Sequence, residues 1–143
     1  MFLGTYSPRL DDKGRLALPA KFRPDLDDGL VVCKGLDRCL FVFATPEFEK
    51  FTHAIRSAPI TDKRVRNYGR TVFASGTKDS LDGQGRIPIS PVLRKYAGLV
   101  KDCVVVGVDT RLEIWDSPTW EAYADEADSA FADIAEVVLP GFF

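Results

Sequence analysis

The chain has 143 residues, 45% of them hydrophobic and 28% charged, and a formal net charge of −2. This composition is normal for a soluble globular protein of ordinary domain size. No apolar run is long enough to span a membrane, and the first seven residues lack the charge and the apolar length of a signal peptide. We therefore expect a cytoplasmic protein with no membrane partner.

The first half of the chain predicts short strands separated by turns and followed by a helix. Residues 11–14 predict a turn in which Gly14 supplies a positive φ. Short apolar runs predict buried strands, and Thr45 is predicted to cap a helix that has Pro46 at its first position. In chain order the expected elements are strands at 5–10 and 15–18, a short helix opened by Pro19 in which Phe22 faces inward, strands at 30–33 and 40–43, and a helix carrying Phe48, Phe51 and Ile55.

The second half predicts the same order of elements after a connecting segment. A helix at about 61–70 and a strand at 71–74 are expected to link the halves. The following elements are then a strand at 86–89, a helix from Ser90 to Gly98, strands at 104–108 and 112–115, and an amphipathic helix opened by Ser117 and Pro118 that carries Trp120, Tyr123, Ala127 and Phe131. Residues 132–143 show no clear periodicity, so this tail is either frayed or docked on a neighbouring subunit.

The two halves are copies of one module. Residues 10–18 return as residues 81–89 at an offset of 71, and the match continues from residue 35 at an offset of 72. Ten identities fall in the 31 aligned positions of 10–23 and 35–51. Because each half would bury too little surface alone, the halves are expected to share one core.

This repeat predicts the domain organisation and the fold class. We expect a first repeat at 1–58, a linking helix and strand at 59–76, a second repeat at 77–131 and a tail at 132–143. The predicted fold is mainly β with short helices, an α+β fold.

Charge is distributed unevenly along the chain. From Asp109 to the end there are nine acids and one base, whereas residues 1–108 hold 18 bases and 12 acids. The bases gather in the first copy, with Arg9, Lys13, Arg15, Lys21 and Arg23, and in the linking helix, with Lys63, Arg64, Arg66 and Arg70. This asymmetry indicates a basic surface suited to duplex DNA, although Arg66 and Arg70 equally fit a solvated helix face.

The sequence offers little for catalysis, cofactor binding or metal binding. His53 is the only histidine and has polar neighbours, which predicts a solvated side chain. The three cysteines lie in or beside apolar runs without Cys-x-x-Cys spacing, which favours buried free thiols over a metal site. No nucleophile and base can be paired, and Gly83-x-Gly85 is no phosphate loop. We expect no enzyme, cofactor, metal or small-molecule substrate.

The repeated Asp-x-x-Gly-Arg turn has two open interpretations. The aspartate can accept backbone N–H groups across a turn that the glycine completes. The arginine that follows can pair with this aspartate and merely stabilise the turn, or its planar guanidinium can reach a phosphate or a guanine edge. The two interpretations are compatible.

These motifs together resemble the MraZ family. They are Asp11-x-Lys13-Gly14-Arg15 followed by Leu16-x-Leu18-Pro19, then Asp82-x-Gln84-Gly85-Arg86-Ile87 and the late Leu112-x-Ile114-Trp115. The resemblance implies two tandem AbrB-like (SpoVT-AbrB) swapped-hairpin repeats that form one compact, barrel-like, pseudo-symmetric domain. It also implies a ring-shaped homo-oligomer.

The resemblance further implies a sequence-specific DNA-binding transcriptional regulator associated with the nucleoid. Its target would be short direct repeats upstream of its own operon in the division and cell-wall gene cluster. Arg15 would be the reader or principal anchor on double-stranded DNA, Asp11 would orient the Arg15 side chain, and Lys13, Lys21 and Arg23 would neutralise phosphates. Asp82 and Arg86 match in the second copy, where Gly83 replaces Asp12 and the surroundings are less basic.

One alternative stays open at this point. An AbrB-like fold can also serve as a protein-interaction or antitoxin-type module without sequence-specific DNA binding. The acidic side chains of the last helix, such as Glu121, Asp125 and Asp128, would fit such a role, although a solvated face explains them equally.

Overall fold

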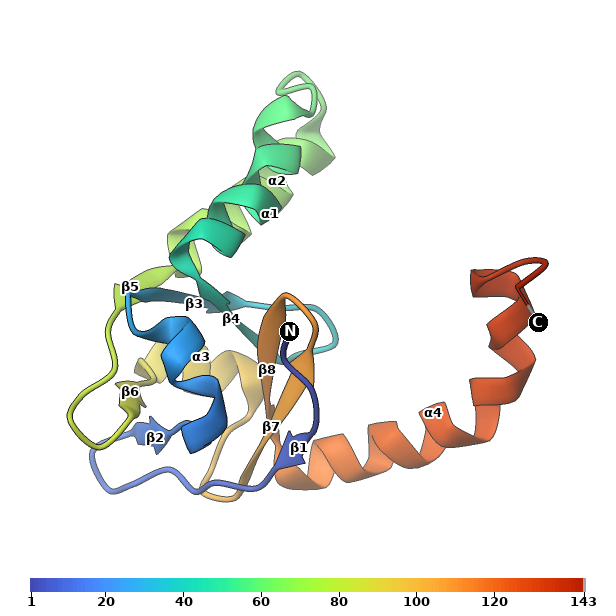
Figure 1. Cartoon of the computed structure of the whole chain (residues 1–143). Coiled ribbons are helices and arrows are strands. Elements are labelled where there is room, and N and C mark those ends of the chain that lie inside the picture. The colour runs from blue at the N-terminus through green and yellow to red at the C-terminus, as the bar shows by residue number, and fades with distance from the viewer. Residues whose placement is uncertain (143) are drawn as a thin grey trace.

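The protein is built on one six-stranded sheet and a separate two-stranded ribbon, shown in Figure 1. The computed structural model describes residues 1–142. The strands of the sheet run in the order β1-β7-β8-β4-β3-β5, and all neighbours are antiparallel. Their bounds are β1 Thr5–Tyr6, β3 Leu30–Lys34, β4 Leu40–Ala44, β5 Thr77–Asp79, β7 Cys103–Val108 and β8 Arg111–Asp116. The ribbon pairs β2, Arg15–Ala17, with β6, Arg86–Pro88.

Four α-helices accompany the strands within residues 1–142. Their bounds are α1 Thr45–Ser57, α2 Lys63–Ser75, α3 Pro91–Ala97 and α4 Ser117–Val138, and two short 3-10 helices, η1 Ala20–Phe22 and η2 Pro24–Leu26, lie between β2 and β3. α1 and α2 form a hairpin that projects from the sheet, and α4 extends away from it toward the C-terminus (Figure 1). None of the helices in residues 1–142 is both long and apolar enough to cross a membrane.

Alternation along the strands gives the sheet an apolar surface on each face. On one face, Val32, Val42 and Ile114 pack against the ribbon, η1 and α3. On the other face, aromatic side chains such as Phe43 and Trp115 pack against α1, α2 and the start of α4. The predicted α+β class is therefore confirmed, and the ribbon is attached to the sheet through a shared core. The expectation of a mainly β fold with short helices is wrong, because α1 and α2 have 13 residues each and α4 has 22.

The ribbon joins the two halves of the chain. The strand that follows the first turn does not form a hairpin with β1, because β1 pairs with β7. Instead, β2 pairs with β6, which follows the second turn, and Leu16 lies opposite Ile87. The six-stranded sheet leaves β1 and β5 as edges and, over the described residues, does not close. The barrel-like and pseudo-symmetric arrangement is therefore not confirmed.

Several predicted element bounds are wrong. The first strand is limited to Thr5–Tyr6, and Thr45 is the first residue of α1 rather than its cap. The predicted strand at 71–74 is helical, because Val72 is buried and Phe73 packs on Phe48 across the hairpin. Here tertiary contacts override the β-propensity of the local residues.

The C-terminal tail also differs from the expectation. α4 continues through Val138, so residues 132–138 are helical. Alanines at 130, 132 and 135 favour the helix at these positions.

The predicted start of α3 at Ser90 and its predicted end at Gly98 are confirmed. Ser90 Oγ accepts the N–H of Leu93, and Gly98 has φ +64°.

Candidate nucleic-acid interface

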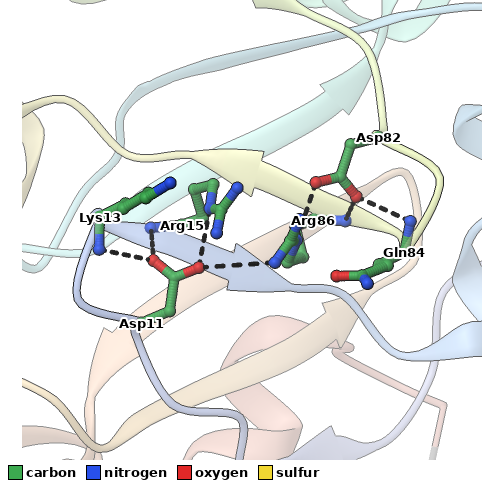
Figure 2. Close-up of polar contacts among 6 residues, drawn as sticks. All are labelled: Asp11, Lys13, Arg15, Asp82, Gln84 and Arg86. Atoms are coloured by element: carbon green, nitrogen blue, oxygen red, sulfur yellow. Dashed lines mark hydrogen bonds and ion pairs between the residues drawn. The ribbon is translucent and has the colours of Figure 1, made fainter.

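The two Asp-x-x-Gly-Arg turns lie next to each other at the ribbon, as Figure 2 shows. Leu16 and Ile87 are completely buried beneath the ribbon. Their neighbours Arg15 and Arg86 are partly exposed, with 31% and 26% of their side-chain surfaces accessible. The alternation of the two strands thus anchors the apolar side chains in the core and leaves an arginine from each turn at the surface.

Each turn is built by one aspartate. Asp11 Oδ1 accepts the backbone N–H groups of Lys13 and Arg15, both at 2.9 Å, and its Oδ2 accepts Arg15 Nε at 2.7 Å. Asp82 repeats these contacts with Gln84 N, Arg86 N and Arg86 Nε at 2.9, 2.8 and 2.8 Å. The pairing of aspartate and arginine, one of the two open interpretations of the motif, is present in both turns.

Glycine is required at the fourth position of each turn. Gly14 and Gly85 have φ values of +73° and +71°, a region that L side chains rarely adopt. Their N–H groups donate to the carbonyls of Asp11 and Asp82 at 3.0 and 2.9 Å. The backbone therefore returns directly into β2 and β6 and presents each arginine at the start of its strand.

The same hydrogen bonds stabilise the charged form of both aspartates. The pKa of Asp82 is lowered from its ordinary value of 3.8 to about 2, first by the backbone N–H of Arg86 and then, against a smaller effect of desolvation, by the Arg86 side chain and the Gln84 N–H. The pKa of Asp11 is also lowered, first by the backbone N–H of Arg15. Both carboxylates are charged at neutral pH and hold the arginine side chains by charge-assisted hydrogen bonds.

These lowered pKa values predict that stability falls in acid. A carboxylate whose folded pKa lies below its unfolded value stabilises the fold above the unfolded pKa, and this contribution is lost as the pH falls through the folded pKa. For Asp82 the window runs from about pH 4 to about pH 2. Denaturant unfolding measured across this window is expected to show a falling midpoint, and Asp82→Asn is expected to flatten that dependence.

The control for this prediction is Asp12→Asn. Asp12 lies in the same turn but its carboxylate accepts no hydrogen bond within residues 1–142. This variant should keep the pH dependence of the unmodified protein. An Asp82→Asn protein with an unchanged pH dependence between about pH 4 and pH 2 contradicts the assignment.

The arginines have donors left after pairing with the aspartates. An arginine carries five N–H donors, and within residues 1–142 the side chain of Arg15 uses only Nε. Arg86 uses Nε for Asp82, and its Nη1 lies 3.8 Å from Asp11 Oδ2, as Figure 2 also shows. Asp11 therefore faces the arginines of both turns, and the terminal amino groups of Arg15 point to no protein acceptor in the described chain.

The remaining predicted site residues lie in different places. Lys13 is exposed beside Asp11 in the first turn, where the second turn has Gln84. Lys21 contacts the aromatic pair Tyr6 and Phe22, with Nζ at 5.3 and 5.6 Å from the ring centroids, rather than either turn.

Arg23 belongs to the turn of the other half. Its Nε donates to the carbonyl of Leu18 at 3.0 Å, and its guanidinium lies against Gly85. Arg23 is one of the bases of the first copy in the sequence, but its guanidinium lies at the second turn.

One residue at the ribbon was not selected from the sequence. Arg94 donates from Nη1 to the carbonyl of Ile89, and its guanidinium lies against Gly14. The signal for it was available, because Arg94 matches Arg23 at the repeat offset of 71. The sequence could not show that each of these arginines crosses to the turn of the other half.

The predicted buried thiols are confirmed. Cys33, Cys39 and Cys103 are free and buried. Burial raises the pKa of Cys33 to about 12 and that of Cys103 to about 11, so both thiols stay protonated at neutral pH. Within residues 1–142 no three His, Cys, Asp or Glu side chains form a group that could hold a metal ion.

Comparison with known proteins agrees with the repeat. A family described as "MraZ protein, putative antitoxin-like" matches twice, at residues 1–71 and 72–139. A protein of Thermobifida fusca (strain YX) named "Transcriptional regulator MraZ" is 57% identical over 141 residues, 99% of each chain. Proteins of the same name from Parafrankia sp. (strain EAN1pec) and Frankia alni are 55% and 54% identical, again over 99% of each chain. With both halves matched and such relatives aligned over almost their full lengths, the chain belongs to the MraZ family.

Proposed function

We propose that this protein is a transcriptional regulator that binds specific sequences in double-stranded DNA through the two turns of the β2–β6 ribbon. The observation that carries the proposal is that Arg15 and Arg86, 71 residues apart in the sequence, lie on one exposed ribbon and are each held by an aspartate. The names of the relatives as transcriptional regulators support it.

The arginines are the anchors of the proposed contact. Because the Nε of each guanidinium is paired with an aspartate, the terminal amino groups are directed before DNA arrives, and less side-chain entropy is lost on binding. A planar guanidinium fits the O6 and N7 acceptors of guanine or two phosphate oxygens. Asp11 and Asp82 thus orient the arginines, with Arg15 as the principal anchor.

The neighbouring bases would supply the affinity that does not depend on sequence. Lys13 lies in the first turn and Lys21 on the following 3-10 helix, whereas the guanidinium of Arg23 is committed to the carbonyl of Leu18. Side chains of this kind neutralise phosphates and release counterions. Because the second turn carries Gln84 in place of Lys13, we propose that the first turn contacts DNA more strongly.

We also propose that copies of the chain assemble into a ring. Trp120 and Tyr123 of α4 pack on Trp115 of the protein's own sheet, but the same helical stripe continues at Phe131, Ile134 and Val138, which are 72%, 50% and 66% exposed. An apolar stripe of this size on a helix with no buried residue requires a partner surface.

The α1–α2 hairpin offers that surface in a second copy. Apolar grooves run along it, lined by side chains that include Ile55, Val65 and Phe73. α2 carries four bases and no acid, whereas α4 carries six acids and no base. A contact between two different surfaces of identical subunits is heterologous, and it closes into a ring when the rotation between neighbours permits.

A ring would suit a target made of repeated sites. One small basic turn supplies little affinity alone, whereas several linked copies raise the overall affinity through effective concentration. We propose short direct repeats upstream of the protein's own operon, in the division and cell-wall gene cluster, as the target. The protein would then be associated with the nucleoid in the cytoplasm.

A DNA titration tests the proposed function. The unmodified protein, Arg15→Ala and Arg86→Ala are titrated against the duplex upstream of the protein's own operon and a scrambled duplex at two salt concentrations. We expect affinity to fall steeply as salt rises. We expect Arg15→Ala to lose about tenfold or more of its preference for the specific duplex, the effect of one bidentate arginine–guanine contact, and Arg86→Ala to lose less.

Controls separate DNA contact from fold and from general charge. Lys50→Ala removes an exposed base on α1 that pairs with Glu47, and it should keep the preference of the unmodified protein. Circular dichroism should be the same for all variants. An Arg15→Ala protein that folds normally and retains both affinity and preference refutes the proposal, and binding that ignores salt favours the protein-interaction alternative.

A further inference from the structure

Each turn glycine is covered by an arginine from the other half of the chain. Gly14 and Gly85 are both buried, although each lies in a surface turn. A Cβ atom on Gly14 would collide with the guanidinium of Arg94, and one on Gly85 would collide with the guanidinium of Arg23. The space that a side chain would occupy is therefore filled by a planar cation.

The hydrogen bonds of these arginines cross between the halves in the same way. Arg94 Nη1 donates to the carbonyl of Ile89, whose own N–H donates to the carbonyl of Gly14 at 2.9 Å. In the other direction, Arg23 Nε donates to the carbonyl of Leu18, whose N–H donates to Gly85 at 2.9 Å. Each arginine thus lies against a turn glycine. It also donates to the carbonyl of the residue whose N–H donates to that same glycine, Ile89 for Gly14 and Leu18 for Gly85.

We propose that Arg94 is a positioning residue for the first turn and holds its backbone in the conformation that presents Arg15 to DNA. Arg23 has the matching role for the second turn. The inference rests on the proposed function and adds a division of tasks. Asp11 orients the Arg15 side chain from within the turn, and Arg94 fixes the turn itself from the other half of the chain.

The geometry requires arginine at position 94. A guanidinium is flat and delocalised, so it can lie against a glycine peptide while an N–H on its edge donates to a carbonyl. The ammonium group of a lysine is a compact point charge and supplies no plane to cover Gly14. Arg94 is also half-buried and committed to Ile89, which sets it apart from an exposed base that contacts phosphate.

Four variants test this role in the full-length protein. Arg94→Ala, Arg94→Lys, Arg23→Ala and Arg15→Ala are titrated with the specific and scrambled duplexes over a range of salt. We expect Arg94→Ala and Arg94→Lys to lose about tenfold in the ratio of specific to scrambled affinity. Arg23→Ala is expected to lose less, because it acts on the less basic turn.

The salt dependence separates positioning from phosphate contact. Loss of one phosphate contact lowers the slope of log affinity against log salt by about 0.9. For the scrambled duplex, we expect Arg94→Ala, which removes the charge, to keep the slope of the unmodified protein. A lysine variant with the full specific-to-scrambled ratio overturns the proposal, as does a ratio that is unchanged in Arg94→Ala.

Hydrogen exchange reports on the turn directly if Arg94→Ala is poorly folded. In Arg94→Lys, the amides of Gly14 and Arg15 are expected to exchange faster, while those of α1 keep their protection. Unchanged exchange at Gly14 and Arg15 overturns the proposal. Failure of the proposed function is recognised separately, because Arg15→Ala would then also leave the specific-to-scrambled ratio unchanged.

Discussion

Leu16→Ala is expected to lower the free energy of unfolding by about 2–5 kcal/mol. Leu16 is completely buried, lies opposite Ile87 in the ribbon and belongs to the core beneath one face of the sheet. Its truncation leaves a cavity where β2 pairs with β6. Because domains of this size are stable by roughly 5–15 kcal/mol, a loss of this order is a large part of the total.

Denaturant unfolding of the purified protein measures this effect. Leu36→Ala is the matched control, since Leu36 is 57% exposed next to the β3–β4 turn. We expect this control to change stability by no more than about 0.5 kcal/mol. A Leu16→Ala loss as small as that of the control would show that the ribbon contributes little to the fold.

Phe131→Glu is expected to break the proposed assembly and with it most of the affinity for DNA. Phe131 is 72% exposed in the part of the α4 stripe that extends beyond the sheet. A carboxylate at this position would have to be desolvated in the contact with the α1–α2 hairpin of a neighbouring copy. Because linking of binding modules raises overall affinity by about 10²–10⁴, the loss on a duplex with several repeats should be of that order.

Light scattering and DNA titration measure the two parts of this prediction. Ser129→Glu is the matched control, because it adds the same charge to α4 at a position opposite the stripe, where the Ser129 hydroxyl donates to the carbonyl of Asp125. The control should keep the mass of the assembly. A Phe131→Glu protein of unchanged mass would exclude the α4 stripe as the contact between copies.

Local features of the structure were predictable from the sequence. The positions of the glycines predict the turns at Asp11 and Asp82, and the apolar runs predict most of the strands. The burial of the cysteines follows from their place in or beside those runs. Errors arose where contacts from distant residues decide the conformation. Residues 71–74 have a strand-like composition, but the packing of Phe73 on Phe48 keeps them in α2.

The sequence predicts the residues of the candidate site but not how the fold brings them together. The sequence singles out Asp11 and Arg15 in the first turn and, because the chain repeats, Asp82 and Arg86 at the matching positions of the second turn. It could not reveal that β2 pairs with β6, since the apolar pattern of each strand is satisfied by any partner that covers Leu16. For the same reason it could not place Arg23 at the second turn or Arg94 at the first.

The crossed pairing of the halves has a consequence for how the chain acquires its structure during synthesis. β1 pairs with β7 and β2 pairs with β6, so Thr5 and Leu16 can contact their partners Val106 and Ile87 only after those distant residues have been synthesised. Pairings so distant in sequence slow folding, and a nascent chain meets them late. The turn that carries Arg15 thus leaves the ribosome 71 residues ahead of the turn beside which it lies, and it reaches its final form only after that second turn has followed.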